Sequence, residues 1–377
     1  MTGAGTIRAA IVGLRHSHVG RLNPKNSSPG HAHSFKQLKG VEVVAYCEDT
    51  DSRLLDDARA FDPNANLYHS VDELIDREDF QLACVCLPAN EVPVAGIKLA
   101  NAGKHFFMEK QFGRTAADLA RLAEAIHRNG VKVLPAYPWR FHPVAQALGR
   151  MIEEGALGKP ISLESRLVTT QVRPGLRAPD GFLYRDETEG GGILHMLGGH
   201  YLEAMRYLAG CEVKAVQAMV GRPVGFIEAP LEDIGIMAME YENGAFGSLH
   251  AGYLLPARDD GYDSCLTFRG EHGWAKWGPV GAPRLEVKSV TPQWAAAPTR
   301  TLDFALAPFS GYGRSLWMFD LVQRFVDGIK ANRPPELTVD DALHILQLIE
   351  AAYESSRTGR RVEVAYGVAA ALAAAAA

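Results

Sequence analysis

The first third of the chain alternates short apolar runs with stretches of helical periodicity, and this alternation constrains the fold more than any other feature. The apolar runs predict strands at residues 7–14, 41–47, 83–87, 105–108 and 131–135. The helical stretches between them lie at residues 34–39, 71–76, 94–102 and 116–128. Parallel strands need a crossover connection that is usually a helix, so this pattern predicts a parallel sheet wound with helices.

From about residue 140 the pattern changes. Helices are predicted at residues 143–154, 193–208, 316–330 and 340–356. Strands are predicted at 161–168, 213–220, 233–241, 245–251 and 264–269, and most of them read as a largely antiparallel sheet. A chain of 377 residues exceeds what one hydrophobic core usually serves. We therefore predict two α/β domains, residues 1–137 and 138–365, followed by an alanine-rich, featureless tail at 366–377.

Composition narrows the class of protein. The chain has 39 basic and 44 acidic residues, a net charge of −5, and no basic stripe with interleaved aromatic residues, which argues against a nucleic-acid partner. Its five cysteines are odd in number, and Cys84 and Cys86 fall in an apolar run, which indicates reduced thiols. No apolar run is long enough to span a bilayer and no leader pattern is seen. We expect a cytoplasmic protein with no membrane partner.

The end of the first predicted strand is a candidate dinucleotide site. Of the glycine fingerprint G-x-G-x-x-G, which lets a backbone approach a pyrophosphate, only Gly13 fits. Glu48 ends the second strand, where a carboxylate binds ribose hydroxyls and repels a 2′-phosphate, so NAD is favoured over NADP. An insertion at about residues 16–27, before the first helix restarts at 31–38, explains why Glu48 follows Gly13 at a longer spacing than usual. The alternative is that Gly13 and Glu48 are a turn and a solvated strand end.

Several motifs together resemble the glucose-fructose oxidoreductase/inositol dehydrogenase/rhizopine-catabolism (Gfo/Idh/MocA) oxidoreductases. They are the helix and strand at 31–45, the turn at 85–88, the Glu109-Lys110 pair after a strand, the run at 140–143, and Gly190-Gly191-Gly192 followed by Gly198-x-His200. The resemblance covers nearly the whole chain.

The resemblance implies an N-terminal Rossmann dinucleotide-binding domain and a C-terminal α/β domain with a large open, mostly antiparallel sheet whose face forms homo-oligomers, dimers or tetramers. It implies NAD(P)-linked hydride transfer at a carbinol of a carbohydrate-like small molecule. It makes Lys110 and His200 the active-site residues. It also implies a set of cofactor contacts, which includes the start of the loop after the first strand. They are Gly13, Leu14, Arg15, Glu48, Pro88, Glu109 and Lys110.

The chain departs from the family pattern at three positions. Gln111 replaces the proline that follows the Glu-Lys pair, and Val92 stands where a histidine is frequent. Met196 occupies the position of an aspartate four residues before the histidine. Members with that aspartate use a Lys, Asp and His trio, so only two of the three groups remain here.

The remaining pair still suits alcohol oxidation. Hydride leaves a carbinol only as its hydroxyl proton is taken, so His200 is the predicted base and Lys110 the group that stabilises the developing alkoxide. With 3.6 residues per turn, Glu203 shares a helical face with His200 and is expected to orient it, whereas His195 lies around the helix.

The predicted substrate-binding residues combine these helix positions with an arginine-rich segment. They are Arg140, Arg177, Arg185, His195 and Glu203. The segment before Gly190 is rich in arginine, with Arg166, Arg173, Arg177 and Arg185. Two interpretations stay open: a solvated charged loop, or a clamp whose guanidinium groups bind an anionic substrate.

The loop after the first strand carries two histidine pairs. His16-x-His18 and His31-x-His33 are spaced like metal ligands, but no Asp or Cys partner set accompanies them. We predict no metal and a loop beside the cofactor.

We predict an NAD-dependent sugar, cyclitol or glycoside dehydrogenase. Two alternatives stay open. One is a glycosidase that uses bound NAD for transient oxidation and elimination, and the other is a non-catalytic sensor that binds the dinucleotide.

Overall fold

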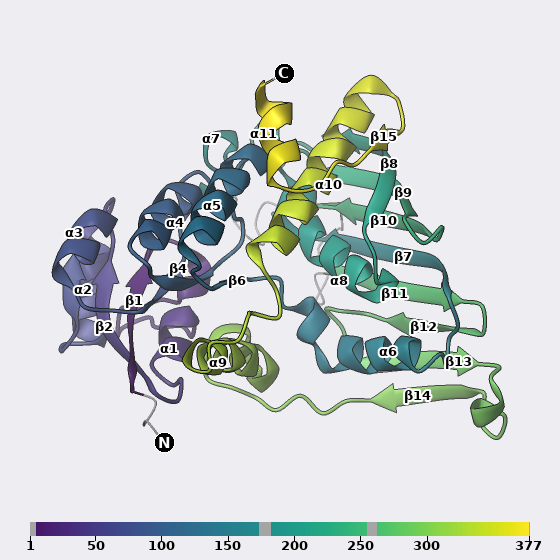
Figure 1. Ribbon diagram of the computed structural model, residues 1–377, viewed down its shortest axis with the longest axis horizontal. Coiled ribbons are helices and arrows are strands. Elements are labelled where there is room, and N and C mark those ends of the chain that lie inside the picture. Colours follow the sequence, from purple (N-terminus) through teal and green to yellow (C-terminus); the bar gives the residue numbers. More distant parts are fainter. Residues whose placement is uncertain (1–4, 173–181, 255–261, 377) are drawn as a thin grey trace. The chain divides into compact units, whose positions relative to one another are not determined.

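A computed structural model describes residues 5–172, 182–254 and 262–376 and divides the chain into two compact units (Figure 1). The first contains Met1–Ala136, Ala307–Leu343 and Gly367–Ala377, and the second contains Tyr137–Leu306 and His344–Tyr366. The first unit thus includes segments from the last fifth of the chain, which a single boundary near residue 137 does not describe.

The first unit holds a sheet of six parallel strands in the order β3-β2-β1-β4-β5-β6. Their bounds are β1 (Ile7–Val12), β2 (Val41–Cys47), β3 (Asn66–Tyr68), β4 (Leu82–Val85), β5 (His105–Met108) and β6 (Val133–Pro135). This confirms the predicted parallel sheet. The order reverses between β1 and β4, so the carboxyl ends of these strands border an open crevice.

Helices connect and cover this sheet. They are α1 (His31–Phe35), α2 (Ser52–Phe61), α3 (Val71–Arg77), α4 (Val92–Asn101), α5 (Ala116–Asn129), α9 (Leu316–Lys330) and α11 (Val368–Ala376). Asp51, Ser70 and Thr115 begin α2, α3 and α5 by accepting backbone N–H groups with their side chains. Figure 1 shows α1 and α9 on one side of the sheet and α4 and α5 on the other.

Three elements of this unit differ from the sequence prediction. The prediction contained neither α2 nor β3. The alanine-rich end, predicted to be featureless, forms α11 and packs against α5, with Ala371 buried. Alanine has the highest helix propensity, and neighbouring α5 supplies the surface that a short alanine helix needs.

The second unit is built on a nine-stranded sheet in the order β14-β13-β12-β11-β7-β10-β9-β8-β15. Only the β7–β10 pair is parallel. The bounds are β7 (Pro160–Thr169), β8 (Val213–Gly221), β9 (Ile234–Tyr241), β10 (Phe246–Gly252), β11 (Tyr262–Gly270), β12 (Gly273–Trp277), β13 (Arg284–Ser289), β14 (Thr299–Asp303) and β15 (Val362–Glu363). The predicted large, mostly antiparallel sheet is confirmed.

One face of this sheet is covered by helices and the other is open. Helices α6 (Pro143–Glu153) and α8 (Gly199–Ala209) lie on the covered face (Figure 1). The short α7 is Asp186–Glu189, and α10 (Val339–Thr358) contributes residues to both units. Along β7, Leu163, Ser165 and Leu167 are buried, whereas Glu164 and Arg166 alternate with them and face outward.

The described ranges contain no helix that is both long enough and apolar enough to cross a bilayer.

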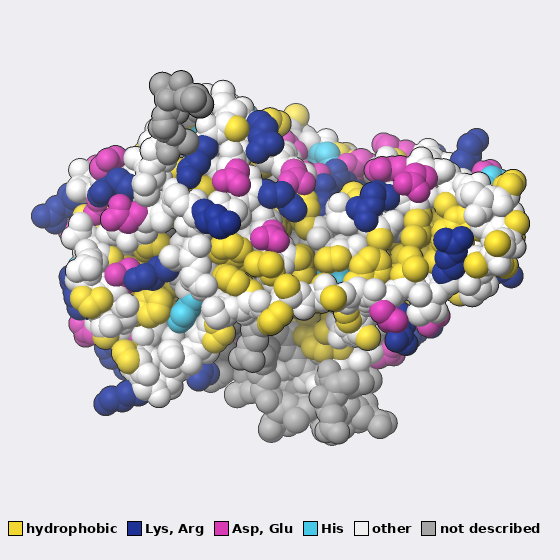
Figure 2. Space-filling view, turned by 90° about the horizontal axis from the view of Figure 1, so that it is seen from below, with side chains coloured by type: hydrophobic (Ala, Val, Ile, Leu, Met, Phe, Trp, Pro, Cys, Tyr) yellow, Lys and Arg dark blue, Asp and Glu magenta, His cyan; other side chains and the backbone are white. Residues whose placement is uncertain are grey.

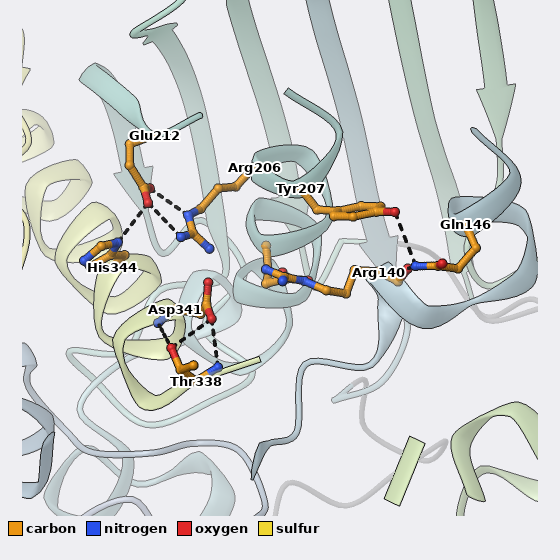
Figure 3. Close-up of polar contacts among 9 residues, drawn as sticks. Arg140, Gln146, Arg206, Tyr207, Glu212, Thr338, Asp341 and His344 are labelled. Carbon is orange, nitrogen blue, oxygen red and sulfur yellow. Dashed lines mark hydrogen bonds and ion pairs between the residues drawn. The ribbon is translucent and has the colours of Figure 1, made fainter. Parts of the chain in front are cut away.

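A half-buried charge cluster joins the end of α8 to α10 in the second unit. Figure 3 shows the Glu212 carboxylate between the guanidinium of Arg206 and the imidazole of His344, at 2.7 Å and 2.9 Å. Burial alone would raise the pKa of Glu212, but the hydrogen bonds and charges of these two partners outweigh burial and lower the pKa to about 2. The cluster therefore stabilises the fold in its ionised form.

We expect Glu212→Gln to lower the Tm by a few degrees (roughly 2–4 °C per kcal/mol for a unit of this size) at neutral pH. A carboxyl whose folded pKa lies below its unfolded value contributes stability above the unfolded pKa and loses it as pH falls through the folded pKa. The Tm difference between wild type and variant should thus be full above pH 4.5 and vanish towards pH 2. Thermal unfolding followed by circular dichroism measures it, and a pH-independent difference contradicts this role.

Candidate functional site

A pocket lies at the carboxyl ends of β1 and β2 in the first unit. Val12 and Gly13 line it from β1, and Cys47 and Glu48 line it from β2. The rest of the lining comes from Asp49, the segment 70–71, Leu87, Asn90, Glu91, Val94, Ala95 and Lys98. Open parallel sheets bind ligands at this position.

Gly13 and Glu48 shape the floor of the pocket. Gly13 has φ +85°, and a Cβ there would lie 2.4 Å from the Cys86 carbonyl oxygen, so only glycine fits. Glu48 is buried, and its carboxylate accepts the N–H of Leu14 at 2.8 Å and the N–H of Thr50 at 3.0 Å. The carboxylate therefore ties the end of β2 to the loop after β1.

Arg15 lies between two carboxylates of this site. Its guanidinium is 3.2 Å from Glu48 and 2.5 Å from Glu91. Burial would lower the pKa of Arg15, but the hydrogen bond and charge of Glu91, with the charges of Glu48 and Asp49, raise it. The positive charge of Arg15 is matched by the carboxylates of Glu48 and Glu91. The pocket therefore stays acidic overall.

Pro88 is buried and begins the segment leading into α4. Its carbonyl oxygen accepts the backbone N–H groups of Glu91 at 2.9 Å and of Val92 at 3.0 Å. Pro88 thereby fixes the turn that carries Asn90 and Glu91 into the pocket lining.

The insertion after β1 is smaller than the sequence suggested. Gly20 and Gly30 touch through their backbones, since a Cβ on Gly30 would lie 2.2 Å from the Gly20 nitrogen. Arg21 and Ser28 then form an antiparallel bridge with hydrogen bonds of 3.1 and 3.2 Å. The excursion is therefore residues 21–28, and the backbone of the loop continues in space from Gly20 to Gly30 and α1.

Glu109 and Lys110 follow β5 and are both buried, at 1% and 6% exposure. One Glu109 oxygen accepts the backbone N–H of Lys110 at 2.5 Å. The other oxygen contacts Nδ1 of His18 and lies 3.3 Å from Nε2 of His31. The histidine-rich loop is thus held on the Glu-Lys pair.

His200 is carried in the second unit by a helix that does not begin as an α-helix. Leu194–Gly198 is a π-helical turn, in which the N–H of Gly199 bonds to the carbonyl of Leu194, five residues earlier. In a π turn, residues five apart are stacked, so the expected 3.6-residue spacing does not apply. The 3.6-residue spacing from which His195 was expected to lie around the helix from His200 therefore does not hold through this turn, and the position of His195 relative to His200 stays a prediction.

Glu232 holds the start of this π turn. Its carboxylate accepts the N–H groups of Gly192 at 2.6 Å and Leu194 at 2.9 Å, and the hydroxyl of Tyr353 at 3.0 Å. Burial raises the pKa of Glu232. A Cβ on Gly192 would lie 2.1 Å from the Glu232 carbonyl oxygen. The last position of the Gly190-Gly191-Gly192 triplet therefore has no room for a side chain.

Arg140, in the short helical turn Trp139–Phe141, forms an ion pair with Glu203 on α8. The guanidinium contacts the Glu203 carboxylate, and the two side chains are 13% and 0% exposed. Arg140 also lies over the ring of Tyr207, whose hydroxyl is 3.3 Å from Gln146 (Figure 3). The His200 ring contacts the ring edge of Tyr137 at 5.4 Å. Glu203 is therefore engaged by Arg140, and its predicted role in holding His200 stays a prediction.

The two described arginines of the arginine-rich segment each lie near a carboxylate of their own. Arg166 points to the open face of the sheet and pairs with Asp263 at 2.8 Å, on the side opposite α8. Arg185 is 57% exposed and lies 3.9 Å from Glu187. Arg173 and Arg177 fall outside the described residues. Arg166 already has a carboxylate partner, and the clamp for an anionic substrate stays a prediction.

Of the two histidine pairs, the rings of His16 and His18 lie 4.8 Å apart, centroid to centroid. His33 packs on Phe61 at 4.7 Å, away from the group around Glu109. Within the described part of the chain, no group of three His, Cys, Asp or Glu residues has an arrangement that could hold a metal ion.

Charges of both signs are mixed on the surface that Figure 2 draws. Lys and Arg side chains alternate there with Asp and Glu side chains, and no basic stripe crosses this face.

Sequence reasoning missed several residues that build the site. They are Gly20, Gly30 and Glu232, together with His18 and His31 as partners of Glu109. Gly30 directly before the helix restart was the one local signal. The others depend on contacts between segments far apart in the chain.

Comparisons with known proteins agree with this geometry. A family profile described as "Oxidoreductase family, NAD-binding Rossmann fold" matches residues 7–137, and one described as "GFO/IDH/MocA C-terminal domain" matches residues 145–276. The chain is 26% identical to a D-apiose dehydrogenase of Paraburkholderia graminis over 353 residues, covering 89% of this chain and 87% of that protein. It is 25% identical to a myo-inositol 2-dehydrogenase of Thermotoga maritima, covering 95% and 98%.

Solved structures share the fold. An oxidoreductase domain protein from Kribbella flavida has a TM-score of 0.82 at 16% identity, covering 96% of this chain and all of that one. A levoglucosan dehydrogenase in complex with NADH and levoglucosan has a TM-score of 0.80 at 20% identity, covering 95% and 99%.

We expect Arg140→Met to destabilise the protein by about 3–5 kcal/mol, because it leaves the Glu203 charge buried without its cation. The double variant Arg140→Met/Glu203→Gln removes that charge and should recover most of the loss. Urea unfolding of wild type, both single variants and the double variant measures the coupling. A loss in the double variant equal to the sum of the two single losses would show that the pair is not coupled.

Proposed function

The chain belongs to the Gfo/Idh/MocA oxidoreductase family, and from that membership we propose that it is an NAD-dependent dehydrogenase oxidising a secondary alcohol of a sugar or cyclitol. The observation that carries the proposal is the acidic pocket at the reversal of strand order, with Glu48 at the end of β2. Its named relatives include D-apiose and inositol dehydrogenases.

The residues of the pocket fit a dinucleotide. A carboxylate offers about four acceptor sites, and Leu14, Thr50 and Arg15 engage three on Glu48, which leaves capacity for a ribose hydroxyl. Gly13 supports the close turn beneath it. A 2′-phosphate would meet Glu48, Asp49 and Glu91, so we propose NAD and not NADP.

When bound, NAD⁺ supplies the acceptor for the hydride of the carbinol carbon. His200 takes the hydroxyl proton as general base, since an imidazole exchanges protons near neutral pH. Lys110 donates a hydrogen bond to the same oxygen and stabilises its developing negative charge. The products are the ketone, NADH and the proton that His200 releases to water.

The π turn bears on the missing aspartate. Met196 is buried in that turn and cannot orient an imidazole. His195 precedes His200 by five residues and lies within the π turn, and we assign it to the substrate-binding side together with Arg140 and Glu203 as supporting residues. π turns are frequent at functional sites.

The open sheet face supports self-association. Met219, Ile236 and Phe246 lie on neighbouring strands and are 77%, 46% and 64% exposed. Large apolar side chains grouped on an open sheet are typical of an interface. We propose that two copies pair through this face, which light scattering on the purified protein tests directly.

We expect His200→Ala and Lys110→Met each to lower kcat at least about 100-fold. D-apiose, myo-inositol and levoglucosan with NAD⁺ are the probes, and NADH absorbance at 340 nm is the measurement. His127→Ala is the matched control, because His127 is 49% exposed and pairs with Asp340 away from this site. It should keep wild-type turnover.

The same assay separates the alternatives. Aglycone release from a glycoside without net NADH would support the NAD-dependent glycosidase. NAD⁺ binding without turnover of a broad sugar panel would support the sensor. Undiminished kcat in His200→Ala would refute the assigned base.

The second expectation concerns Glu48. Glu48→Gln keeps an acceptor for the Leu14 N–H but removes the negative charge that faces a 2′-phosphate. The Kd of NADP⁺ relative to NAD⁺ should therefore fall about tenfold, since like charges at short range are unfavourable. Titration of protein fluorescence with each dinucleotide measures both constants, and an unchanged ratio contradicts the assignment.

A further inference from the structure

The histidines of the loop after β1 have no role in the hydride transfer proposed above. Two of them nevertheless contact one buried carboxylate. His18 lies in a short helical turn of the loop, and His31 begins α1. Both imidazoles reach the same oxygen of Glu109, His18 through Nδ1 and His31 through Nε2. One histidine from each of the two pairs that are spaced like metal ligands therefore contacts the carboxylate of Glu109.

The Glu109 carboxylate is committed at both ends. It is 1% exposed, and its second oxygen accepts the backbone N–H of Lys110 at 2.5 Å. A buried carboxylate without donors is very unfavourable, so these contacts determine where the Glu109-Lys110 peptide lies.

Tyr312 closes the group from the C-terminal part of the first unit. Its hydroxyl is 3.0 Å from Nδ1 of His18, and its ring lies 4.0 Å from the His31 ring, centroid to centroid. Its backbone N–H donates to the Ser34 hydroxyl on α1 at 2.9 Å. The two histidines are thus fixed from a third segment.

The charges within the group favour an ionised Glu109. Burial alone would raise the pKa of Glu109, but the charges and hydrogen bonds of His18 and His31 lower it well below its usual range. Burial lowers the pKa of His18, which Glu109 opposes, and lowers that of His16. The titratable groups that act on this site are His16, His18, His31, Lys110, Cys86 and Tyr312.

We propose that His18 and His31 are positioning residues that hold the Glu109 carboxylate in one orientation and thereby fix the Lys110 peptide against the loop from Gly13 to Gly30. The inference rests on the proposed function, in which that loop binds NAD⁺ and Lys110 acts on the alcohol. His18 donates from Nδ1 and His31 from Nε2.

The test uses variants that keep or remove one donor. An asparagine amide can replace an Nδ1–H donor and a glutamine amide an Nε2–H donor, whereas leucine has neither. His18→Leu and His31→Leu should each lower kcat and weaken NAD⁺ binding about tenfold, because hydrogen bonds to charged groups contribute more than neutral ones. His18→Asn and His31→Gln should stay within about threefold of wild type.

The pH dependence gives a readout that loss of packing would not move. In wild type, Glu109 stays ionised and the NAD⁺ Kd should be flat from pH 8 to 5. In the leucine variants, burial with fewer donors raises the Glu109 pKa, so affinity should fall as pH falls through it. His33→Leu is the control, because His33 packs on Phe61 and should keep the flat profile.

Three results would overturn the proposal: wild-type kcat and affinity in folded leucine variants, amide variants no better than leucine, or a flat pH profile throughout. If Lys110→Met also leaves kcat unchanged, the proposed function fails instead. If the leucine variants do not fold, ¹⁵N-histidine NMR of the NAD⁺-saturated wild type decides. A hydrogen absent from Nδ1 of His18 or from Nε2 of His31 at pH 7 contradicts the arrangement.

Discussion

The reversal of strand order between β1 and β4 is the constraint on which the candidate site depends. It leaves the carboxyl ends of β1 and β2 beside a crevice instead of under a crossover helix, and the pocket with Gly13 and Glu48 lies there. Glu109 follows β5 in the same sheet, so the residues of the first unit assigned to the cofactor and to chemistry all follow strand ends.

Buried carboxylates connect separate segments within each unit. Glu48 joins the end of β2 to Leu14, and Glu109 joins the end of β5 to the loop after β1. In the second unit, Glu203 joins α8 to Arg140, and Glu232 holds the π turn. An unpaired buried carboxylate costs several kcal/mol, so each pairing restricts its segment to few arrangements. The carboxylates that would destabilise the protein without partners thus hold these segments in place.

Sequence patterns predicted most of the elements because hydrophobic periodicity reports burial. The bounds of β2, β5 and α9 match the predicted runs, and α10 differs by one residue at its start and two at its end. The strands β12 to β15 were missed, since the last predicted strand ended at residue 269 and short strands carry weak signals. The π turn was missed because a 3.6-residue period was assumed for the whole helix. The Glu109 group could not be predicted, because it joins residues 18, 31, 109 and 312.

The most direct measurement of the central claim is isotope transfer from substrate to cofactor. D-apiose, myo-inositol and levoglucosan carrying deuterium on every carbon would each be incubated with the protein and NAD⁺, and the NADH formed would be weighed by mass spectrometry. A dehydrogenase that moves hydride from a carbinol gives NADH heavier by about one mass unit, since one deuterium is transferred with the electron pair. NADH of ordinary mass, or product formed without any NADH, would contradict the account.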